Sequence, residues 1–135
     1  MVNYPIHIEP DGDGYLVTCP DLPEVTSDGA TMEAAFANGA DAVDEALAGR
    51  LDEFLDIPQP SEGDVTVSVP SLTGLKVMLY WELRDQDLCR ADLMEALGWE
   101  QNQVDCLFAP RHMTRMDQFD AAFEALGKRV MMKVT

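Results

Sequence analysis

Short runs of apolar and β-branched residues at the start of the chain alternate with turn-forming residues, a pattern typical of antiparallel strands. Two of these runs, residues 4–9 (YPIHIE) and 15–19 (YLVTC), flank the stretch DGDG at residues 11–14. Asp and Gly at this place predict a tight hairpin turn, because glycine adopts positive φ at little steric cost. Residues 24–27, bracketed by prolines and a glycine, predict a third short strand.

A pattern with a helical period follows. Apolar side chains, among them Met32 and Phe36, recur at steps of three and four as far as Phe54, which predicts an amphipathic helix of about six turns. Thr31 is its expected N-cap, and Glu33 is favourable in the first turn. The carboxylates expected on its solvent face are Asp41, Asp44, Glu45, Asp52 and Glu53.

Strict alternation returns at residues 64–69 (DVTVSV), which predicts a half-buried strand. Together these elements give the order β-β-β-α-β over residues 1–70, a small sheet covered by one helix. The segment PSLTG, which ends at Gly74, is the expected boundary to a second module over residues 75–135.

The second module is predicted to be mostly helical, so the chain as a whole belongs to the α+β class. Helical periods run through residues 75–86, 89–98, 99–108 and 114–127. Thr114 is the expected N-cap of the last helix, and Asp117 stands three residues on, close to a capping box. Residues 129–134 (RVMMKV) alternate weakly and predict a short C-terminal strand.

Gly98 joins two of these helices in a tight turn, which is the signature of a helix-turn-helix. We expect Gly98 to be the C-cap of the first helix, and Gln101, Asn102 and Gln103 to be exposed at the start of the second. Amides of this kind can hydrogen-bond adenine edges in the major groove. The side chains that could contact phosphates are Lys76, Arg90, Arg111, His112 and Arg115. A helical bundle used only for dimerisation is the alternative, because the fold does not dictate the function.

The charge of the chain is uneven and supports the division into two modules. Residues 1–74 hold 15 acidic residues and one basic residue, for a formal charge of −14, whereas residues 75–135 hold 10 acidic and 8 basic residues, for −2. A strongly acidic module repels nucleic acid and membrane surfaces and attracts basic proteins. Solubility alone is the other interpretation of this charge.

Catalytic and metal chemistry find little support in the sequence. An EF-hand loop starting at Glu9 would need an oxygen ligand at Pro20, whose side chain has none. A nuclease site in which Asp11, Asp13 and Asp21 hold a divalent metal is a further hypothesis, although Asp11 and Asp13 share one turn. The cysteines are odd in number, form no C-x-x-C pair and are expected to be buried or half-buried packing residues: Cys19, Cys89 and Cys106. With neither a signal pattern nor a long apolar run, we expect a cytoplasmic protein.

Residues 4–43 resemble the N-terminal domain of HicB antitoxins, with its succession of strand, acidic turn, strand, P-D-L-P, strand, glycine and threonine-led helix. Residues 75–130 resemble the C-terminal helix-turn-helix of the DNA-binding HicB subgroup. The resemblance covers nearly the whole chain, and the two modules stand in the expected order.

The resemblance implies a partial ribonuclease-H-like first domain that has lost catalysis and needs no cofactor. It also implies a partner, the small basic ribonuclease toxin HicA, whose RNA-cleaving site the antitoxin covers, and repression of the shared operon through the second domain. The side chains that we expect on local physical grounds to form salt bridges with this toxin are Asp11, Asp13, Asp21, Glu24 and Asp28.

Helix-turn-helix proteins normally bind as dimers on half-sites about one helical turn apart. The edge of the predicted strand RVMMKV could pair with its copy, so we expect a homodimer or a higher homo-oligomer. A plain transcriptional regulator whose first domain senses a ligand is the alternative function, although no feature of the first module indicates a small-molecule pocket.

Overall fold

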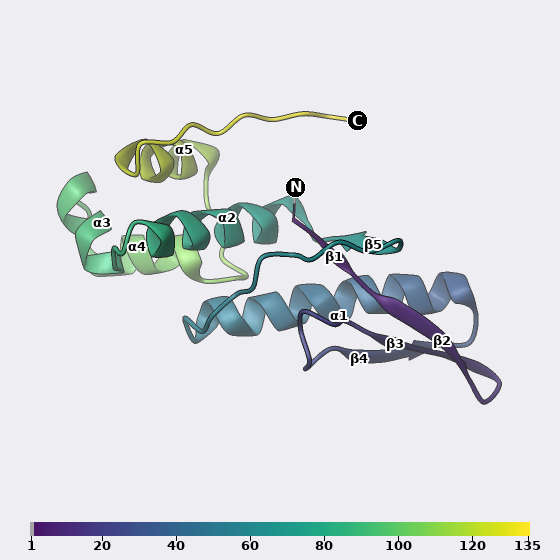
Figure 1. Ribbon diagram of the computed structural model, residues 1–135. Helices are drawn as coiled ribbons and strands as arrows, with labels where there is room; N and C mark the ends of the chain where they lie inside the picture. The colour runs from purple at the N-terminus through teal and green to yellow at the C-terminus, as the bar shows by residue number, and fades with distance from the viewer. Residues whose placement is uncertain (1) are drawn as a thin grey trace.

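The computed structural model describes residues 2–135 and places five strands and five helices within them (Figure 1). Strands β2 (His7–Asp11), β3 (Gly14–Thr18) and β4 (Thr26–Gly29) form an antiparallel sheet in the order β2-β3-β4. The long helix α1 (Met32–Asp52) lies across one face of this sheet. The α+β class predicted from the sequence is confirmed.

The acidic turn between β2 and β3 is a hairpin, as predicted. Asp11 pairs with Gly14, so only Gly12 and Asp13 form the loop. Gly12 has a φ of 58°, a conformation that glycine adopts without steric strain. Strand β4 also forms, although it begins two residues later than the predicted stretch 24–27.

The first predicted strand is in fact two strands that belong to different sheets. Strand β1 (Asn3–Pro5) pairs with β5 (Thr66–Ser68), and the chain then crosses to pair as β2 with β3. At the crossing, the Ile6 N–H donates to the carbonyl of Val65 over 2.9 Å. The predicted strand 64–69 is therefore present but short, with Val67 as its buried residue.

Helix α1 begins as predicted. The hydroxyl of Thr31 accepts a hydrogen bond of 3.0 Å from the Ala34 N–H, and Glu33 lies in the first turn. The helix packs closely on β3, because a Cβ at Gly39 would stand only 2.7 Å from Cγ1 of Val17. Its first two turns differ from the prediction, since Met32 and Phe36 belong to the apolar stripe and are nevertheless exposed.

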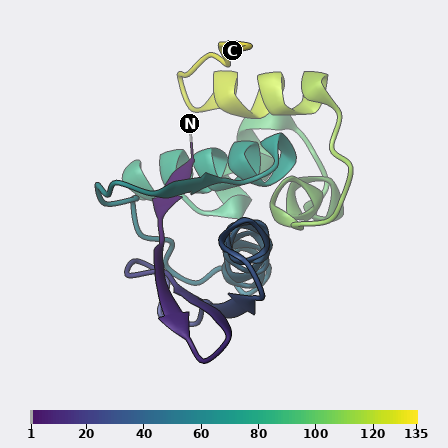
Figure 2. The same cartoon turned by 90° about the vertical axis from the view of Figure 1, so that its right-hand side faces the viewer.

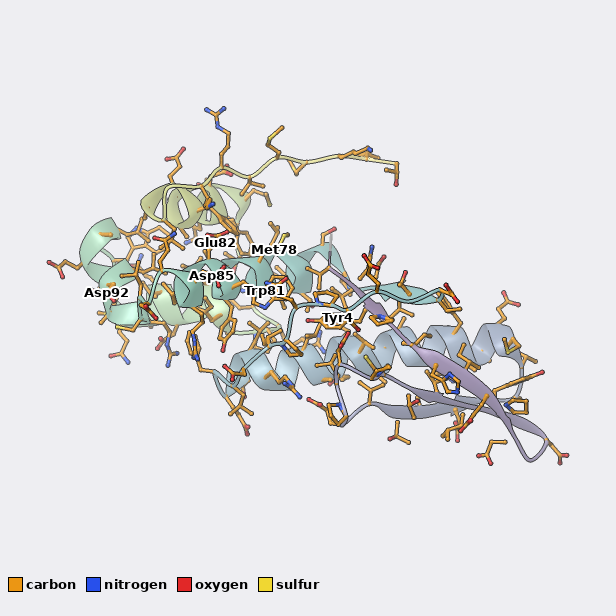
Figure 3. The ribbon with its side chains drawn as sticks, viewed as in Figure 1. Tyr4, Met78, Trp81, Glu82, Asp85 and Asp92 are labelled. Atoms are coloured by element: carbon orange, nitrogen blue, oxygen red, sulfur yellow. The ribbon has the colours of Figure 1, made fainter. Side chains whose placement is uncertain are left out.

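The segment between α1 and β5 has no regular structure, yet aromatic side chains hold it in place. The Tyr80 hydroxyl donates to the carbonyl of Leu55 at 2.7 Å, and the Trp81 Nε1 donates to that of Ile57 at 2.8 Å. The Tyr4 hydroxyl donates to the carbonyl of Pro58. Through these bonds Tyr4 anchors the segment to β1 and Trp81 anchors it to helix α2; both side chains are labelled in Figure 3.

The second half of the chain forms four helices: α2 (Ser71–Asp85), α3 (Arg90–Leu97), α4 (Gln101–Phe108) and α5 (Met116–Ala125). Helix α2 starts before the expected boundary, because PSLTG forms its first turn with the Gly74 N–H bonded to the carbonyl of Pro70. Gly98 ends α3 in the left-handed conformation with a φ of 67°, which confirms it as the C-cap.

Two expectations for the C-terminal third are wrong. Arg115, and not Thr114, occupies the N-cap of α5, because the hydroxyl of Thr114 lies against Lys76 and the Cys106 carbonyl. Residues 129–134 form no strand. A strand needs a hydrogen-bonding neighbour, and within residues 2–135 none of the five strands pairs with this segment.

The elements stack in layers, which Figures 1 and 2 show from two directions. The three-stranded sheet lies at one end, then α1, then α2, and α5 at the other end. One apolar core runs through these layers, and Phe54 joins the two halves by edge contacts with the rings of Tyr80 and Phe108. The division into domains at residues 70 and 75 stays a prediction.

Candidate binding surfaces

The turn at Gly98 positions the candidate recognition helix α4. Leu93 of α3 and Val104 and Leu107 of α4 are buried, so both helices are fixed to one core. The first turn of α4 is exposed and carries Gln101, Asn102 and Gln103, as expected from the sequence.

The three amides differ in what they bond within the chain. The Gln103 side-chain oxygen accepts the N–H of Glu100 at 2.9 Å, so this amide caps its own helix. Gln101 and Asn102 project from the same turn into solvent. These two are therefore the better placed of the predicted base-contacting residues.

Each arginine that was expected to contact phosphate is bonded to a carboxylate. Arg90 donates to Asp105 at 3.1 Å, and Arg115 is paired with Asp117. Arg111 donates to Asp44 at 3.0 Å and also to Glu45, both on α1. The bond with Asp44 raises the pKa of Arg111. Asp44, expected on the solvent face, is half-buried here because it also accepts the Thr73 hydroxyl at 2.6 Å.

Lys76 is not a phosphate contact, because its side chain is fully buried. Its ammonium group donates to the carbonyls of Cys106 and Leu107 at 2.7 and 3.2 Å, and to the Thr114 hydroxyl at 2.8 Å. Burial lowers the pKa of Lys76 to about 8, which leaves it mostly protonated at pH 7. The phosphate contact predicted for Lys76 requires an exposed side chain, but α2 is central and is covered on more than one side.

The five predicted toxin-contacting carboxylates fall into two groups. Asp11 and Asp13 at the hairpin and Asp28 on β4 are exposed. Asp21 and Glu24 instead have partners within the chain. Asp21 accepts the N–H and the hydroxyl of Ser61, both at 2.9 Å.

Glu24 forms a bidentate salt bridge with Arg50. The Nε and Nη2 atoms of Arg50 donate to its two oxygens at 2.7 and 2.8 Å, and this lowers the pKa of Glu24. Arg50 also donates to the carbonyl of Asp56. Because the same guanidinium bonds both segments, Glu24 helps to fix the loop after α1, and the exposed group of Asp11, Asp13 and Asp28 is the one open to a partner.

The three cysteines are free thiols in different surroundings. Cys19 is buried, Cys106 is half-buried, and Cys89 is exposed, which corrects the expectation for Cys89. Burial raises the pKa of the Cys19 thiol. In residues 2–135, no three His, Cys, Asp or Glu side chains lie close enough together to hold a metal ion. Among the same residues, no helix combines the length and the apolar character needed to cross a membrane.

Comparison with known proteins settles the family. Residues 3–78 match the family described as "HicB_like antitoxin of bacterial toxin-antitoxin system". The chain belongs to this family of HicB-like antitoxins. The match includes the whole β-rich half and the first turns of α2.

Relatives named as HicB antitoxins align along almost the whole chain. Antitoxin HicB 2 of Photorhabdus laumondii is 32% identical, with 96% of this chain and 94% of the relative covered. Antitoxin HicB of Pseudomonas fluorescens is 28% identical, with 99% of this chain and 94% of the relative covered. Antitoxin HicB of Escherichia coli K12 is 27% identical, with 97% of this chain and 98% of the relative covered. The similarity to HicB antitoxins therefore extends through α3, α4 and α5.

Proposed function

We propose that the chain is an antitoxin that binds and blocks a small basic ribonuclease of the HicA type, and that its helix-turn-helix represses the operon encoding both proteins. Membership of a family of antitoxins supports a regulator rather than an enzyme. Inhibition then requires only that the acidic half, residues 1–74, cover the toxin's catalytic groups. The complex is expected to form in the cytoplasm.

One observation carries the toxin-binding half of this proposal: the formal charge of −14 over residues 1–74 is displayed on the surface. Within residues 2–74, 13 of the 15 carboxylate residues are exposed, and only Asp21 and Asp44 are half-buried. Complementary charge accelerates the encounter with a basic partner and selects against other partners.

The DNA-binding half of the proposal rests on α3, Gly98 and α4. The amides of Gln101 and Asn102 stand at the exposed start of α4, where a helix-turn-helix contacts base edges. A dimer would place two such helices on successive half-sites. The exposed apolar side chains of the C-terminal segment, Met131, Met132 and Val134, offer a surface on which a second copy could pack.

Co-expression tests both halves. We expect the full-length chain to co-purify with the small basic protein of the shared operon in stoichiometric amount, and the complex to protect one palindromic stretch of operon DNA from nuclease digestion. Retention of DNA without any protein partner, together with affinity for DNA that depends on a metabolite, would instead favour a ligand-sensing regulator.

A further inference from the structure

A hollow of about 560 Å³ lies between strand β2 and the first two turns of α1. Its apolar lining comes from three separate segments: Ile6 and Ile8, Met32 and Phe36, and Val65. We call this hollow the β2–α1 groove. It contains three of the large apolar side chains that the chain leaves exposed: Met32 at 53%, Phe36 at 41% and Val65 at 45%.

The path of the chain explains why these side chains are uncovered. Met32 and Phe36 continue the apolar stripe of α1 that Ala35, Gly39 and Val43 bury against the sheet. The sheet, however, ends at β2, because the residues before it leave as β1 to pair with β5. The stripe therefore extends past the edge strand β2, and Met32 and Phe36 at its beginning remain exposed.

The border of the groove is acidic. Glu33 and Asp64 line it directly, and Asp64 also lines a neighbouring polar hollow together with Glu62. His7 is the basic residue of the lining, and it faces Glu9 over 3.5 Å. An apolar floor with a carboxylate border fits a partner that presents apolar side chains flanked by Lys or Arg.

A second copy of the chain fits this groove poorly. Two copies meeting here would bring Glu33 and Asp64 toward the same carboxylates, each within a half that carries a formal charge of −14. Like charges facing each other across an interface disfavour association. The charge of the groove therefore favours a basic partner over self-association.

We propose that the β2–α1 groove is the docking surface for the basic partner. Apolar side chains of that partner pack on Met32, Phe36 and Val65, and its cationic groups meet Glu33 and Asp64. This inference rests on the proposed function, because the partner is the basic ribonuclease of the same operon. It adds the place of contact, which lies at β2 and the first turns of α1, whereas Glu24 is bonded to Arg50 in the last turn of that helix.

The decisive experiment measures the affinity of the full-length chain for the operon's basic protein, carrying a substitution that silences its catalysis. The groove variant is Met32→Ser with Phe36→Ser. The matched control is Leu55→Ser, which removes a side chain that is 50% exposed outside the groove. We expect the groove variant to bind at least 30-fold more weakly, as is typical when an apolar anchor of an interface is lost. The control should bind like the unchanged chain.

A second pair of variants tests the acidic border. Glu33→Gln with Asp64→Asn should slow association several-fold at low salt and reduce its dependence on salt. Asp41→Asn with Asp52→Asn removes two exposed carboxylates of α1 that do not line the groove, and should have a smaller effect. Thermal unfolding of every variant verifies that the fold is retained.

The outcomes separate the two proposals. If the unchanged chain binds the basic protein and the folded groove variant binds equally well, the groove is not the docking surface and the antitoxin proposal stands. If the unchanged chain does not bind the basic protein, both proposals fail. If the groove variant changes the mass of the free chain in solution, a second copy occupies the groove and the inference is overturned.

Discussion

The two halves of the chain present their charges in opposite ways. In the first half, Asp11, Asp13 and Asp28 are exposed on strands and turns. In the second half, the guanidinium groups of Arg90 and Arg111, which flank α4 in sequence, are each bonded to a carboxylate of the same chain. A basic partner can therefore approach the first half without any exchange of ion pairs, whereas a phosphate that approaches these arginines must compete with Asp105 and Asp44.

This difference assigns different physical tasks to the two halves. The first half can attract a basic partner over a long range, because most of the chain's net negative charge is concentrated there. In the function proposed here, recognition of DNA would depend more on the amides of Gln101 and Asn102 and on dimer geometry than on a basic surface. The bonds from Arg111 to Asp44 and Glu45 also connect the two halves, because these carboxylates lie on α1.

The largest expected effect comes from Lys76, the one basic side chain that is fully buried within residues 2–135. Lys76→Met keeps the volume of the side chain but removes the ammonium donor from the Leu107 carbonyl and leaves the Cys106 carbonyl with only the weaker bond from the Thr114 hydroxyl. We expect a loss of about 3 kcal/mol in the free energy of unfolding, because buried acceptors without partners are costly. Urea denaturation measures it. Lys128→Met, at an exposed lysine, is the control, and a loss below about 0.5 kcal/mol for Lys76→Met would contradict the structural role.

The next effect concerns the exposed amides of α4. Gln101→Ala with Asn102→Ala should weaken binding to the operon's protected DNA by about 10- to 100-fold, while affinity for unrelated DNA of equal length changes little. Gln59→Ala, in the segment between α1 and β5, is the control. Electrophoretic mobility shifts at fixed salt give both affinities. An equal loss on both DNAs would show that these amides do not read bases.

A smaller effect is expected at the turn between α3 and α4. Gly98→Ala forces a side chain into the left-handed region, at a cost of about 1 kcal/mol in stability. Gly49→Ala is the comparison variant, and its effect on stability should have the opposite sign. Gly49 lies in α1, has open space around it and is not at positive φ. There alanine should stabilise the helix by about 0.5–1 kcal/mol. If both variants shifted the midpoint of thermal unfolding in the same direction, the claim that the turn between α3 and α4 requires glycine at position 98 would be contradicted.

The smallest effect tests the link between the halves. Glu45→Gln weakens the pairing of Arg111 with α1 and should raise the affinity for DNA by about two- to threefold, since exposed ion pairs are weak. Asp41→Asn removes the same charge from α1 at a position that does not pair with Arg111. Equal gains from both variants would mean that only net charge matters and not the pairing.

Local signals allowed much of the fold to be predicted. The DGDG hairpin, the Thr31 cap and the Gly98 turn each depend on a few neighbouring residues, whose conformational preferences are strong. The exposure of Gln101 and Asn102 followed from the same turn, because it sets where α4 begins.

The predictions that were wrong concern features that depend on how distant segments of the chain pack. Lys76 lies on α2, and its burial follows from α4 and Thr114 closing over it, which no local pattern encodes. Met32 and Phe36 lie on the apolar stripe of α1 as predicted, but they are exposed because the sheet that would cover them ends at β2. Residues 129–134 alternate like a strand, yet a strand also requires a neighbour.

The most direct test of the central claim is a titration of RNA cleavage. The basic ribonuclease of the shared operon is held at fixed concentration with a labelled RNA, and the full-length chain is added in steps. We predict that cleavage falls in proportion to the added chain and stops once antitoxin and toxin are present in stoichiometric amounts. Cleavage that continues at full rate in excess of this chain would contradict the account.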